Sequence, residues 1–494
     1  MNIHALAEWK SRLLMEVKAK IKVLKKNHRR ESEKVLDNEK VKTFLDQFHQ
    51  RFVITPTDKA GNNFSIICKK FYISCLLKEL GISKTRGKGS PTKTYKLVKT
   101  KSENDIVKEH ITHMNSHSIN LIPSQKSLPF LYWIPKMHKN PSKQRYIAAS
   151  HSCTTKPLSK MITYCLKLIQ QTHKHYCEKI SKACKTHRMW IVDNSVEVLN
   201  KISVCNQRTV RNVRTYDFST LYTSIPHAKL KTRMAVVINQ CFNKTGRRSI
   251  QFGQKTAKWS RAKGTNKRYW TANDLIYHVN YLIDNIYVVC GNTLFRQVIG
   301  IPMGTDCAPF LANLFLYSYE CEWVCKRKKD KDFDILNKFK YCFRYIDDLL
   351  CINNDQLMDE VMHEIYPPEL SLTSDDATVQ ANYLDLSIEI RKGKIHTSLF
   401  DKRDAFGFTI VNFPDLSGNI PEKQSYGVFV SQLIRYSRCC QDLANFRERT
   451  RTLVKRLVRQ NFSLRRLART FEKFAESNYE LLFKYGVHVC PSCL

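Results

Sequence analysis

Residues 343–350 of the chain read Phe-Arg-Tyr-Ile-Asp-Asp-Leu-Leu, a run of apolar and aromatic residues that contains two adjacent acids. Asp347 and Asp348 suit the interior of a β-strand poorly, because aspartate has low strand propensity and neighbouring carboxylates repel each other. They fit a tight turn between two buried strands, with both carboxylates exposed at its tip. An ordinary surface hairpin would also explain this stretch if it stood alone.

A further acid follows another apolar strand upstream. Residues 215–222 read Thr-Tyr-Asp-Phe-Ser-Thr-Leu-Tyr and place Asp217 near the end of that strand. If the two strands are neighbours, three carboxylates converge, and such oxygen ligands favour Mg2+ or Mn2+. Two such ions at one site activate an attacking hydroxyl and stabilise a leaving pyrophosphate in nucleotidyl transfer. The two segments together predict a two-metal site.

Three more motifs stand in order around these acids. Residues 300–309 read Gly-Ile-Pro-Met-Gly-Thr-Asp-Cys-Ala-Pro and lie between the two acidic segments. Upstream are Leu-Tyr-Trp-Ile-Pro-Lys-Met-His-Lys at 131–139 and Gln-Arg-Tyr-Ile at 144–147. The series resembles the reverse transcriptases, whose best-known signature is the Tyr-x-Asp-Asp found here at 345–348. A single four-residue motif recurs by chance, whereas five ordered motifs at workable spacing do not.

The flanks resemble one branch of these enzymes, the Penelope-like retroelements, whose polymerase is related to telomerase. The residues Tyr383, Leu384, Asp385 and Leu386 are similar to the primer-grip region of that branch. Further similar segments lie on both sides of the central motifs, at 58–61, 393–397, 400–402, 419–421 and 431–435. The resemblance therefore extends from about residue 50 to about residue 470.

The resemblance implies a role for each acid at the centre. Asp217 and Asp347 would ligate two Mg2+ or Mn2+ ions, together with the backbone carbonyl of Phe218. Asp348 would support the site with less direct contact. The implied reaction is attack of a primer 3′-hydroxyl on the α-phosphate of a deoxynucleoside triphosphate (dNTP).

The resemblance also implies a dNTP pocket. Tyr222 would lie under the sugar, where its ring would clash with a 2′-hydroxyl and so select deoxynucleotides. Gly304 would allow the backbone to approach the nascent base pair closely. The remaining pocket residues would be Gln297 and Met303 along the wall, and Lys136 and Arg145 at the triphosphate, Arg145 through a bidentate fork. Considered singly, Tyr222 could be a core aromatic and Lys136 a solvated surface lysine.

The composition favours a polyanionic partner. The 494-residue chain has 82 Lys and Arg against 44 Asp and Glu, a formal net charge of 82 − 44 = +38. The excess is spread over several segments: 244–270 holds nine basic and no acidic residues, and 435–469 holds eleven basic and two acidic residues. A long positive groove for nucleic acid explains this distribution better than separate solvated faces do. We expect 244–270 to be an inserted surface loop.

The sequence shows no secretory signal and no apolar run long enough to span a membrane. Its 18 cysteines are scattered, which favours reduced thiols in the nucleus or cytosol. His488, Cys490 and Cys493 look like half of a zinc site, but no second Cys/His pair lies nearby, so we expect an exposed tail. The predicted location is the nucleus, or the cytoplasm before nuclear entry.

The fold that the resemblance implies is an α+β right-hand polymerase, with fingers, a palm containing an antiparallel sheet, and a helical thumb. The expected domains are a basic amphipathic helical segment at 1–50, an extension at 51–125, fingers at 126–215, a palm at 216–401 and a thumb with tail at 402–494.

The predicted function is RNA-directed DNA synthesis by a retroelement enzyme, with an RNA template, a DNA primer and dNTPs as partners. We see no GIY-YIG nuclease motif after the polymerase, so we expect the chain to extend existing 3′ ends. Two other interpretations stay open. One is a catalytically inactive nucleic-acid-binding protein derived from a retroelement, and the other is a telomerase-like enzyme with a dedicated RNA.

Overall fold

The computed structural model divides into two compact units, Met1–Ile54 with Ile66–Ile73, and Thr55–Ser65 with Ser74–Leu494. It describes residues 3–27, 38–82, 94–120, 126–138, 142–184, 186–206, 209–262, 268–374, 379–418 and 420–486. The expected tail with His488, Cys490 and Cys493 lies outside the described residues. Among those residues, no helix combines the length and the hydrophobicity that crossing a bilayer requires.

The smaller unit is mostly helical. It contains α1 (Ile3–Asn27), α2 (Asn38–Arg51), the outer ends of β1 (Phe52–Thr57) and β2 (Ala60–Cys68), and the start of α3 (Lys69–Glu79). The rings of Phe44, Phe48 and Phe52 follow one another at centroid distances of 6.1 and 4.9 Å. These aromatic contacts join α2 to the strand that follows it.

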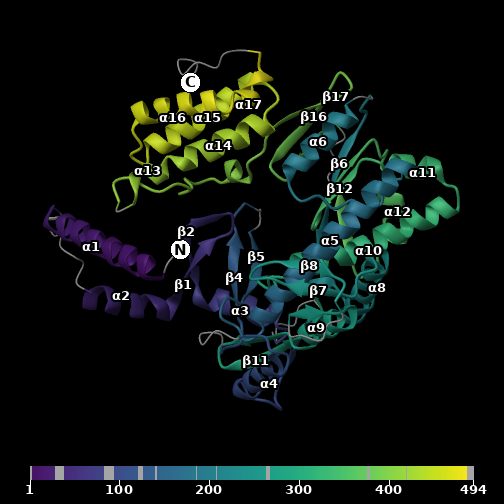
Figure 1. Cartoon of the computed structure of the whole chain (residues 1–494), viewed down its shortest axis with the longest axis horizontal. Coiled ribbons are helices and arrows are strands. Elements are labelled where there is room, and N and C mark those ends of the chain that lie inside the picture. Colours follow the sequence, from purple (N-terminus) through teal and green to yellow (C-terminus); the bar gives the residue numbers. More distant parts are fainter. Residues whose placement is uncertain are drawn as a thin grey trace. The chain divides into compact units, whose positions relative to one another are not determined.

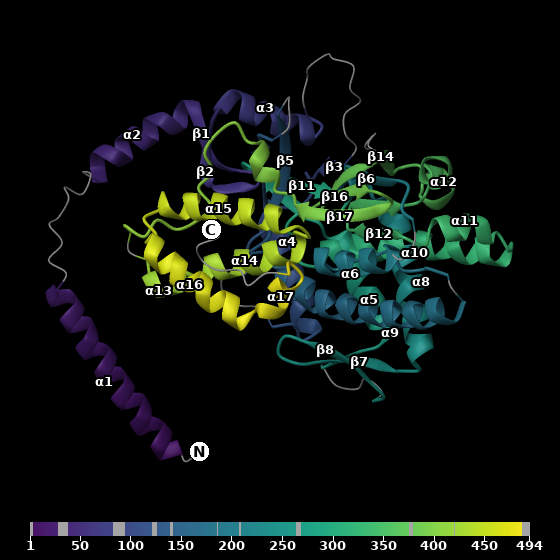
Figure 2. The same ribbon diagram turned by 90° about the horizontal axis from the view of Figure 1, so that it is seen from above.

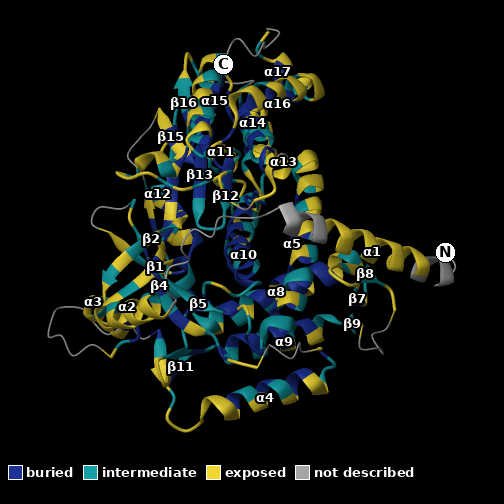
Figure 3. Cartoon of the chain, turned by 90° about the vertical axis from the view of Figure 1, so that its left-hand side faces the viewer, coloured by how far each residue is buried: buried dark blue, intermediate teal, exposed yellow. Residues whose placement is uncertain are grey.

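The central sheet of the larger unit has four antiparallel strands in the order β12-β13-β6-β14. Its strands are β6 (Val213–Ser219), β12 (Cys342–Tyr345), β13 (Asp348–Ile352) and β14 (Ser371–Ser374). Side chains alternate between the two faces of a strand. Leu349 and Cys351 therefore lie in one hydrophobic core, whereas Leu350 and Ile352 lie in another. Burial of both faces explains why the run after the two acids is continuously apolar (Figure 3, dark blue).

The hydrophobic core on the first face of this sheet also contains residues of several helices. They are α5 (Lys156–Cys184), α7 (Leu221–Ser224), α8 (His227–Thr245), α9 (Ala272–Asp284), α10 (Ala308–Lys329), α11 (Phe333–Lys338) and α12 (Leu357–Ile365). α10 carries buried residues on successive positions from Leu311 to Ser318, so it is buried around its whole circumference there. Such a pattern is typical of a helix at the centre of a core.

A five-stranded sheet has the order β3-β11-β10-β4-β5. Its elements are β3 (Tyr95–Leu97), β4 (Phe130–Lys136), β5 (Lys143–Ala149), β10 (Tyr287–Cys290) and β11 (Thr293–Gln297), with α4 (Glu103–Ser116) between β3 and β4 in the chain. β4 and β5 pair antiparallel along their full length, from Phe130 opposite Ala149 to Lys136 opposite Lys143. The inner ends of β1 and β2 lie against β4, where the Asp58 amide donates to the Pro135 carbonyl at 3.0 Å.

The basic segment 244–270 is not a loop in its described part, so that expectation is wrong. It forms a three-stranded sheet of β7 (Ser249–Phe252), β8 (Ala257–Ser260) and β9 (Tyr269–Trp270). Trp259 donates from Nε1 to Thr172 Oγ1 on α5 at 2.9 Å, and Ile250 and Trp270 are buried. The apolar residues interleaved with the nine basic ones anchor this sheet on the helices below it.

The C-terminal part of the larger unit begins with a sheet of β15 (Gln380–Tyr383), β16 (Leu386–Arg391) and β17 (Lys394–Leu399), followed by the 3-10 helix η1 (Lys402–Ala405). A helical bundle follows, with α13 (Glu422–Ser425), α14 (Gly427–Cys439), α15 (Leu443–Val458), α16 (Leu464–Ser477) and α17 (Tyr479–Phe483). α14, α15 and α16 lie side by side in both views (Figure 1, yellow; Figure 2). Their core includes the second face of the central sheet and α6 (Ser195–Cys205).

Candidate active site

The two adjacent acids occupy a tight turn at one end of the central sheet. Tyr345 pairs with Asp348, so Ile346 and Asp347 form the two-residue connection between β12 and β13. Ile346 has a φ of 55°, a left-handed conformation that a β-branched residue rarely adopts. Such backbone strain costs about 1–3 kcal/mol and persists only where the surroundings hold it. The turn is therefore imposed by the fold around it.

The third acid lies beside this turn. Asp348 at the start of β13 stands directly opposite Asp217 on β6. The amide of Phe218 donates to the carbonyl of Asp347 at 3.1 Å, which joins β6 to the turn. The structure thus brings the three sequence-predicted carboxylates together, with Asp217 and Asp348 on two paired strands and Asp347 in the adjoining turn.

A buried polar network holds the turn from below. The Arg344 side chain is fully buried and forms an ion pair with Glu320 on α10, which is fully buried too, at 2.5 Å. One nitrogen of the guanidinium, Nη1, donates at 2.9 Å both to the Ile346 carbonyl and to Oδ1 of Asn313. Tyr366 donates to Glu320 at 3.0 Å. This network fixes the left-handed residue of the turn to the central helix.

The tyrosine of the expected primer grip also supports the turn. The Tyr383 hydroxyl donates to the Phe343 and Asp348 carbonyls at 3.1 and 3.3 Å, and its ring is buried. Leu386 is buried as well, while Leu384 is half-buried at a φ of 56°. Asp385 forms an ion pair with Arg435 at 2.8 Å. In this segment the contacts of Tyr383 and Asp385 go to the sheet and to α14.

The carboxylates create a strongly negative site. Burial, together with the neighbouring charges of Asp347 and Asp217, raises the pKa of Asp348 to about 6, although Lys402 and Lys59 oppose the increase. A carboxyl whose ionised form is disfavoured by other carboxylates is stabilised by a bound cation. Asp217 is exposed and Asp347 is half-buried, so both acids are accessible to solvent ions.

The donor set fits Mg2+ or Mn2+ with completion by a substrate. Among the residues that the structure describes, no three His, Cys, Asp or Glu side chains are arranged to hold a metal ion by themselves. Mg2+ commonly uses one or two carboxylates together with water and substrate phosphates, rather than a closed protein cage. Two carboxylates and a backbone carbonyl, all hard oxygen donors, meet that requirement.

Tyr222 lies between the acids and the Gly-Ile-Pro-Met-Gly segment. Burial raises the pKa of its phenol, and the charge of Asp347 adds to the effect, which places the ring near that acid. The Tyr222 carbonyl accepts from the Ile301 amide at 2.6 Å, and the Ile225 carbonyl accepts from the Gly300 amide at 2.8 Å. His227 Nε2 donates to the Gly300 carbonyl at 2.7 Å. The backbone around Tyr222 is thereby locked to residues 300–301.

Packing within the protein requires a glycine at 304, whereas the resemblance implies close approach to a nascent base pair. Gly304 has a φ of 122°, and a Cβ there would overlap the carbonyl oxygen of Ala148 on β5. The Ala148 amide donates to the Met303 carbonyl at 2.9 Å. Close approach of β5 therefore requires glycine before any substrate is considered. Gln297 is buried and donates to the Ile299 carbonyl at 3.0 Å, so it shapes its own loop.

The two expected triphosphate ligands lie on paired strands. Lys136 ends β4 and Arg145 lies in β5, and both are half-buried. Arg145 forms an ion pair with Asp58 at 3.1 Å. Sequence reasoning missed this partner, as it missed Glu320 and the two lysines near Asp348, Lys59 and Lys402. The quoted Asp-Lys-Ala-Gly run at 58–61 was the available signal for Asp58 and Lys59.

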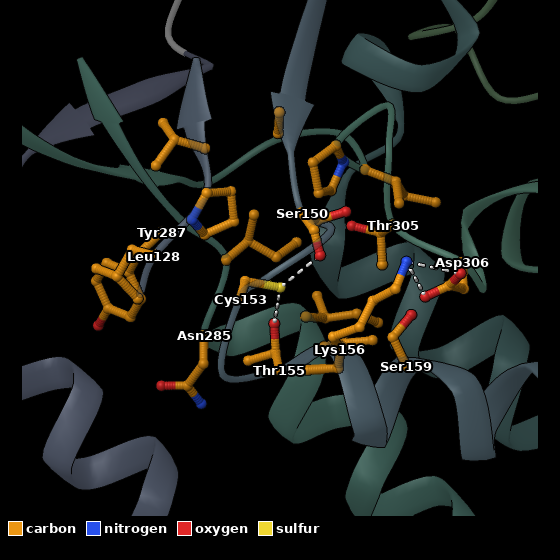
Figure 4. A pocket seen from close by; sticks show the side chains of 18 of the residues that line it. Leu128, Ser150, Cys153, Thr155, Lys156, Ser159, Asn285, Tyr287, Thr305 and Asp306 are labelled. Carbon is orange, nitrogen blue, oxygen red and sulfur yellow. Dashed lines mark hydrogen bonds and ion pairs between the residues drawn. The ribbon is translucent and has the colours of Figure 1, made fainter. Parts of the chain in front are cut away.

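A small cavity lies behind the Gly304 segment (Figure 4). Its volume is about 30 Å3, and Lys156 and Asp306 form an ion pair at 2.8 Å across one side. The sulfur of Cys153 donates to the Ser150 carbonyl at 3.1 Å. A nucleotide needs far more space than this, since small-molecule sites measure about 300–1,000 Å3. The cavity is therefore too small for a nucleotide and is part of the packing around that segment.

Comparison with solved structures identifies the fold. The telomerase of Candida albicans, in complex with a TWJ fragment of telomeric RNA, matches over 90% of this chain and 69% of its own, with 13% identity and a TM-score of 0.55. The chain has the right-hand polymerase fold.

Weaker matches accompany it. Apo telomerase from Candida tropicalis, truncated from its C-terminal domain, matches over 71% of this chain and 64% of its own, with 12% identity and a TM-score of 0.42. The RNA-dependent RNA polymerase of a human picobirnavirus matches over 98% and 86%, with 11% identity and a TM-score of 0.42. The chain thus spans about two thirds of the telomerase chains. No protein-family model and no curated protein matches the sequence.

Proposed function

We propose that this chain is an RNA-directed DNA polymerase of the Penelope-like retroelement type. The observation that carries the proposal is the cluster of Asp217, Asp347 and Asp348, on two paired strands and the strained turn beside them, within a right-hand polymerase fold. A protein that only binds nucleic acid has no use for three clustered carboxylates, which repel a phosphate backbone.

The chain's own residues would bind and orient the reactants. Asp217, Asp347 and the Phe218 carbonyl would hold two Mg2+ or Mn2+ ions, with Asp348 in support. When bound, such ions activate the primer 3′-hydroxyl and stabilise the leaving pyrophosphate. Lys136 and Arg145 would bind the triphosphate and offset the negative charge that develops on it.

The choice of sugar would depend on Tyr222. Its backbone carbonyl accepts from the Ile301 amide, and its half-buried ring packs against the hydrophobic core. A ring held there would exclude a 2′-hydroxyl and favour dNTPs over ribonucleotides. The accompanying domain proposal assigns fingers to 126–215, a palm to 216–401 and a thumb to 402–494.

The partners would be an RNA template and a DNA primer, and the enzyme would act in the nucleus. The net charge of +38 supports extensive contact with phosphates. We propose that the primer is a pre-formed 3′ end, which the chain extends without cutting DNA itself.

Extension of poly(rA)·oligo(dT) by the purified chain tests this function. We expect dTTP incorporation with Mg2+ or Mn2+ and none with EDTA. Tight binding of the duplex without any incorporation would favour the catalytically inactive alternative. Copurification of one defined RNA that serves as the template would favour the telomerase-like alternative. Incorporation of UTP in place of dTTP would instead indicate an RNA polymerase.

A further inference from the structure

The hairpin formed by the inner ends of β1 and β2 carries two charged residues at its tip. Thr57 ends β1 and Ala60 begins β2, so Asp58 and Lys59 form a two-residue connection. Lys59 adopts a left-handed conformation with a φ of 66°. As a result the two side chains diverge: Asp58 is 4% exposed, whereas Lys59 is exposed to solvent.

The hairpin is anchored on one side to the strand that carries Lys136. The Asp58 amide donates to the Pro135 carbonyl at 3.0 Å, directly before that lysine in the chain. The Thr55 hydroxyl donates to the Trp133 carbonyl at 3.5 Å. These bonds set the position of the tip relative to the end of β4.

A second anchor fixes the hairpin to the segment that follows η1. The Asn63 side chain donates to the Thr409 carbonyl and accepts from the Val411 amide, both at 2.9 Å. This segment comes shortly after Lys402, the other lysine whose charge reaches Asp348. The hairpin is thus held between two parts of the chain that carry basic residues of the site.

The ion pair between Asp58 and Arg145 is incomplete. It joins Oδ1 to Nη1 at 3.1 Å, with Asp58 buried and Arg145 about one third exposed. Asp58 Oδ2 and Arg145 Nε are buried and have no hydrogen-bond partner among the described residues. A purely structural pair of this kind would normally use the full bidentate fork of the guanidinium. Here the carboxylate restrains Arg145, and the exposed third of its side chain stays open to a second anion.

The exposed Lys59 lies beside the two expected triphosphate ligands. Its neighbour Asp58 forms the ion pair with Arg145, and the Asp58 amide bonds to the carbonyl directly before Lys136. A lysine next to two groups that bind a triphosphate is in reach of the same phosphates. An exposed ammonium on a rigid tip is suited to bind a polyphosphate, because it brings a point charge without a fixed orientation.

We propose that the Asp58–Lys59 tip is part of the nucleotide-binding site: Lys59 contacts the polyphosphate of the incoming nucleotide, and Asp58 is a positioning residue that orients Arg145 toward the same group. This inference rests on the proposed function. It adds a third basic group, from a hairpin remote in sequence, to the two that the central motifs supply.

Steady-state kinetics of Lys59→Gln and Asp58→Asn on poly(rA)·oligo(dT) test the proposal. We expect the KM for dTTP to increase by about tenfold in Lys59→Gln, the effect of one lost hydrogen bond to a charged group. Asp58→Asn should raise the same KM, and Lys59→Arg should restore most of the affinity. Affinity for primer–template without dTTP should stay within about twofold of wild type.

Lys108→Gln is the matched control, because Lys108 is an exposed lysine on α4 and loses the same charge. A KM for dTTP in Lys59→Gln equal to that of Lys108→Gln would overturn the inference while leaving the proposed function intact. If the wild type incorporates nothing, the proposed function fails. Binding of a fluorescent dTTP analogue in Mg2+ then decides for Lys59: weaker binding by Lys59→Gln supports the inference, and equal binding refutes it.

Discussion

The buried pair of Arg344 and Glu320 offers the most informative perturbation of the site. Both side chains are fully buried, so Arg344→Met leaves a carboxylate without its cation in the core. Removing one partner of a buried ion pair costs about 3–5 kcal/mol of unfolding free energy. The variant also loses the donor to the Ile346 carbonyl, so we expect loss of both stability and polymerisation.

The double variant Arg344→Met with Glu320→Leu separates these two effects. Apolar residues of similar size often replace a buried ion pair without loss of stability, so the unfolding free energy should largely recover. Activity should not recover, because no side chain then holds the left-handed residue of the turn. A hydrogen bond from a charged donor contributes about 1.5–3 kcal/mol, so primer extension should stay about tenfold to hundredfold below wild type.

Urea unfolding measured by circular dichroism gives the stability, and dTTP incorporation at saturating primer–template gives the activity. Recovery of both quantities together in the double variant would show that Arg344 acts through stability alone. A loss below about 1 kcal/mol in Arg344→Met would show that the pair is not buried as described.

Three further predictions concern the pocket, the fold and the nucleic acid. Tyr222→Val should increase UTP incorporation relative to dTTP on the same template, and unchanged discrimination in a competition assay would place Tyr222 in the core only. Burial lowers the pKa of both His113 and His278 to about 4, below the 6.5 of an exposed histidine. Between pH 6.5 and pH 4 the unfolded chain therefore binds more protons than the folded chain. As the pH is lowered through that range, the unfolding free energy should fall by up to about 1.4 kcal/mol per pH unit per histidine. His113→Gln should flatten this decline in urea unfolding at pH 7.5 and pH 5, and an unchanged slope would contradict it. Affinity for primer–template should fall with salt, with a slope of log K on log salt of about −4 or steeper, and a slope near zero would exclude the expected groove.

The central hairpin could be predicted because its signal is local. Two acids in an apolar run require a turn, and the structure has that turn at Ile346 and Asp347. The register that brings Asp217 opposite Asp348 also agrees with the expected neighbourhood of the two strands. The local pattern was sufficient for the turn, whereas the neighbourhood of the two strands was a separate assumption, since they lie far apart in the sequence.

The supporting contacts could not be predicted because they join distant residues. Arg344 lies in a strand beside aromatic residues, and nothing local shows that Glu320, 24 positions earlier, neutralises it. Asp58 and Arg145 are likewise far apart in the sequence. The prediction for 244–270 failed for a different reason. Its nine basic residues dominate the composition, whereas its fold depends on apolar residues such as Ile250 and Trp270, which are buried. Net charge describes a surface, while burial depends on the few residues that face inward.

The central claim is that Asp217 and Asp347 carry nucleotidyl transfer, and one comparison tests it directly. Wild type, Asp217→Asn, Asp347→Asn and the control Asp334→Asn, an exposed acid on α11, are assayed side by side for dTTP incorporation on poly(rA)·oligo(dT). We predict no incorporation by the first two variants, full incorporation by the control, and primer–template affinity that is equal to or slightly above wild type throughout. Incorporation by Asp347→Asn at the wild-type rate would contradict the assignment of the site.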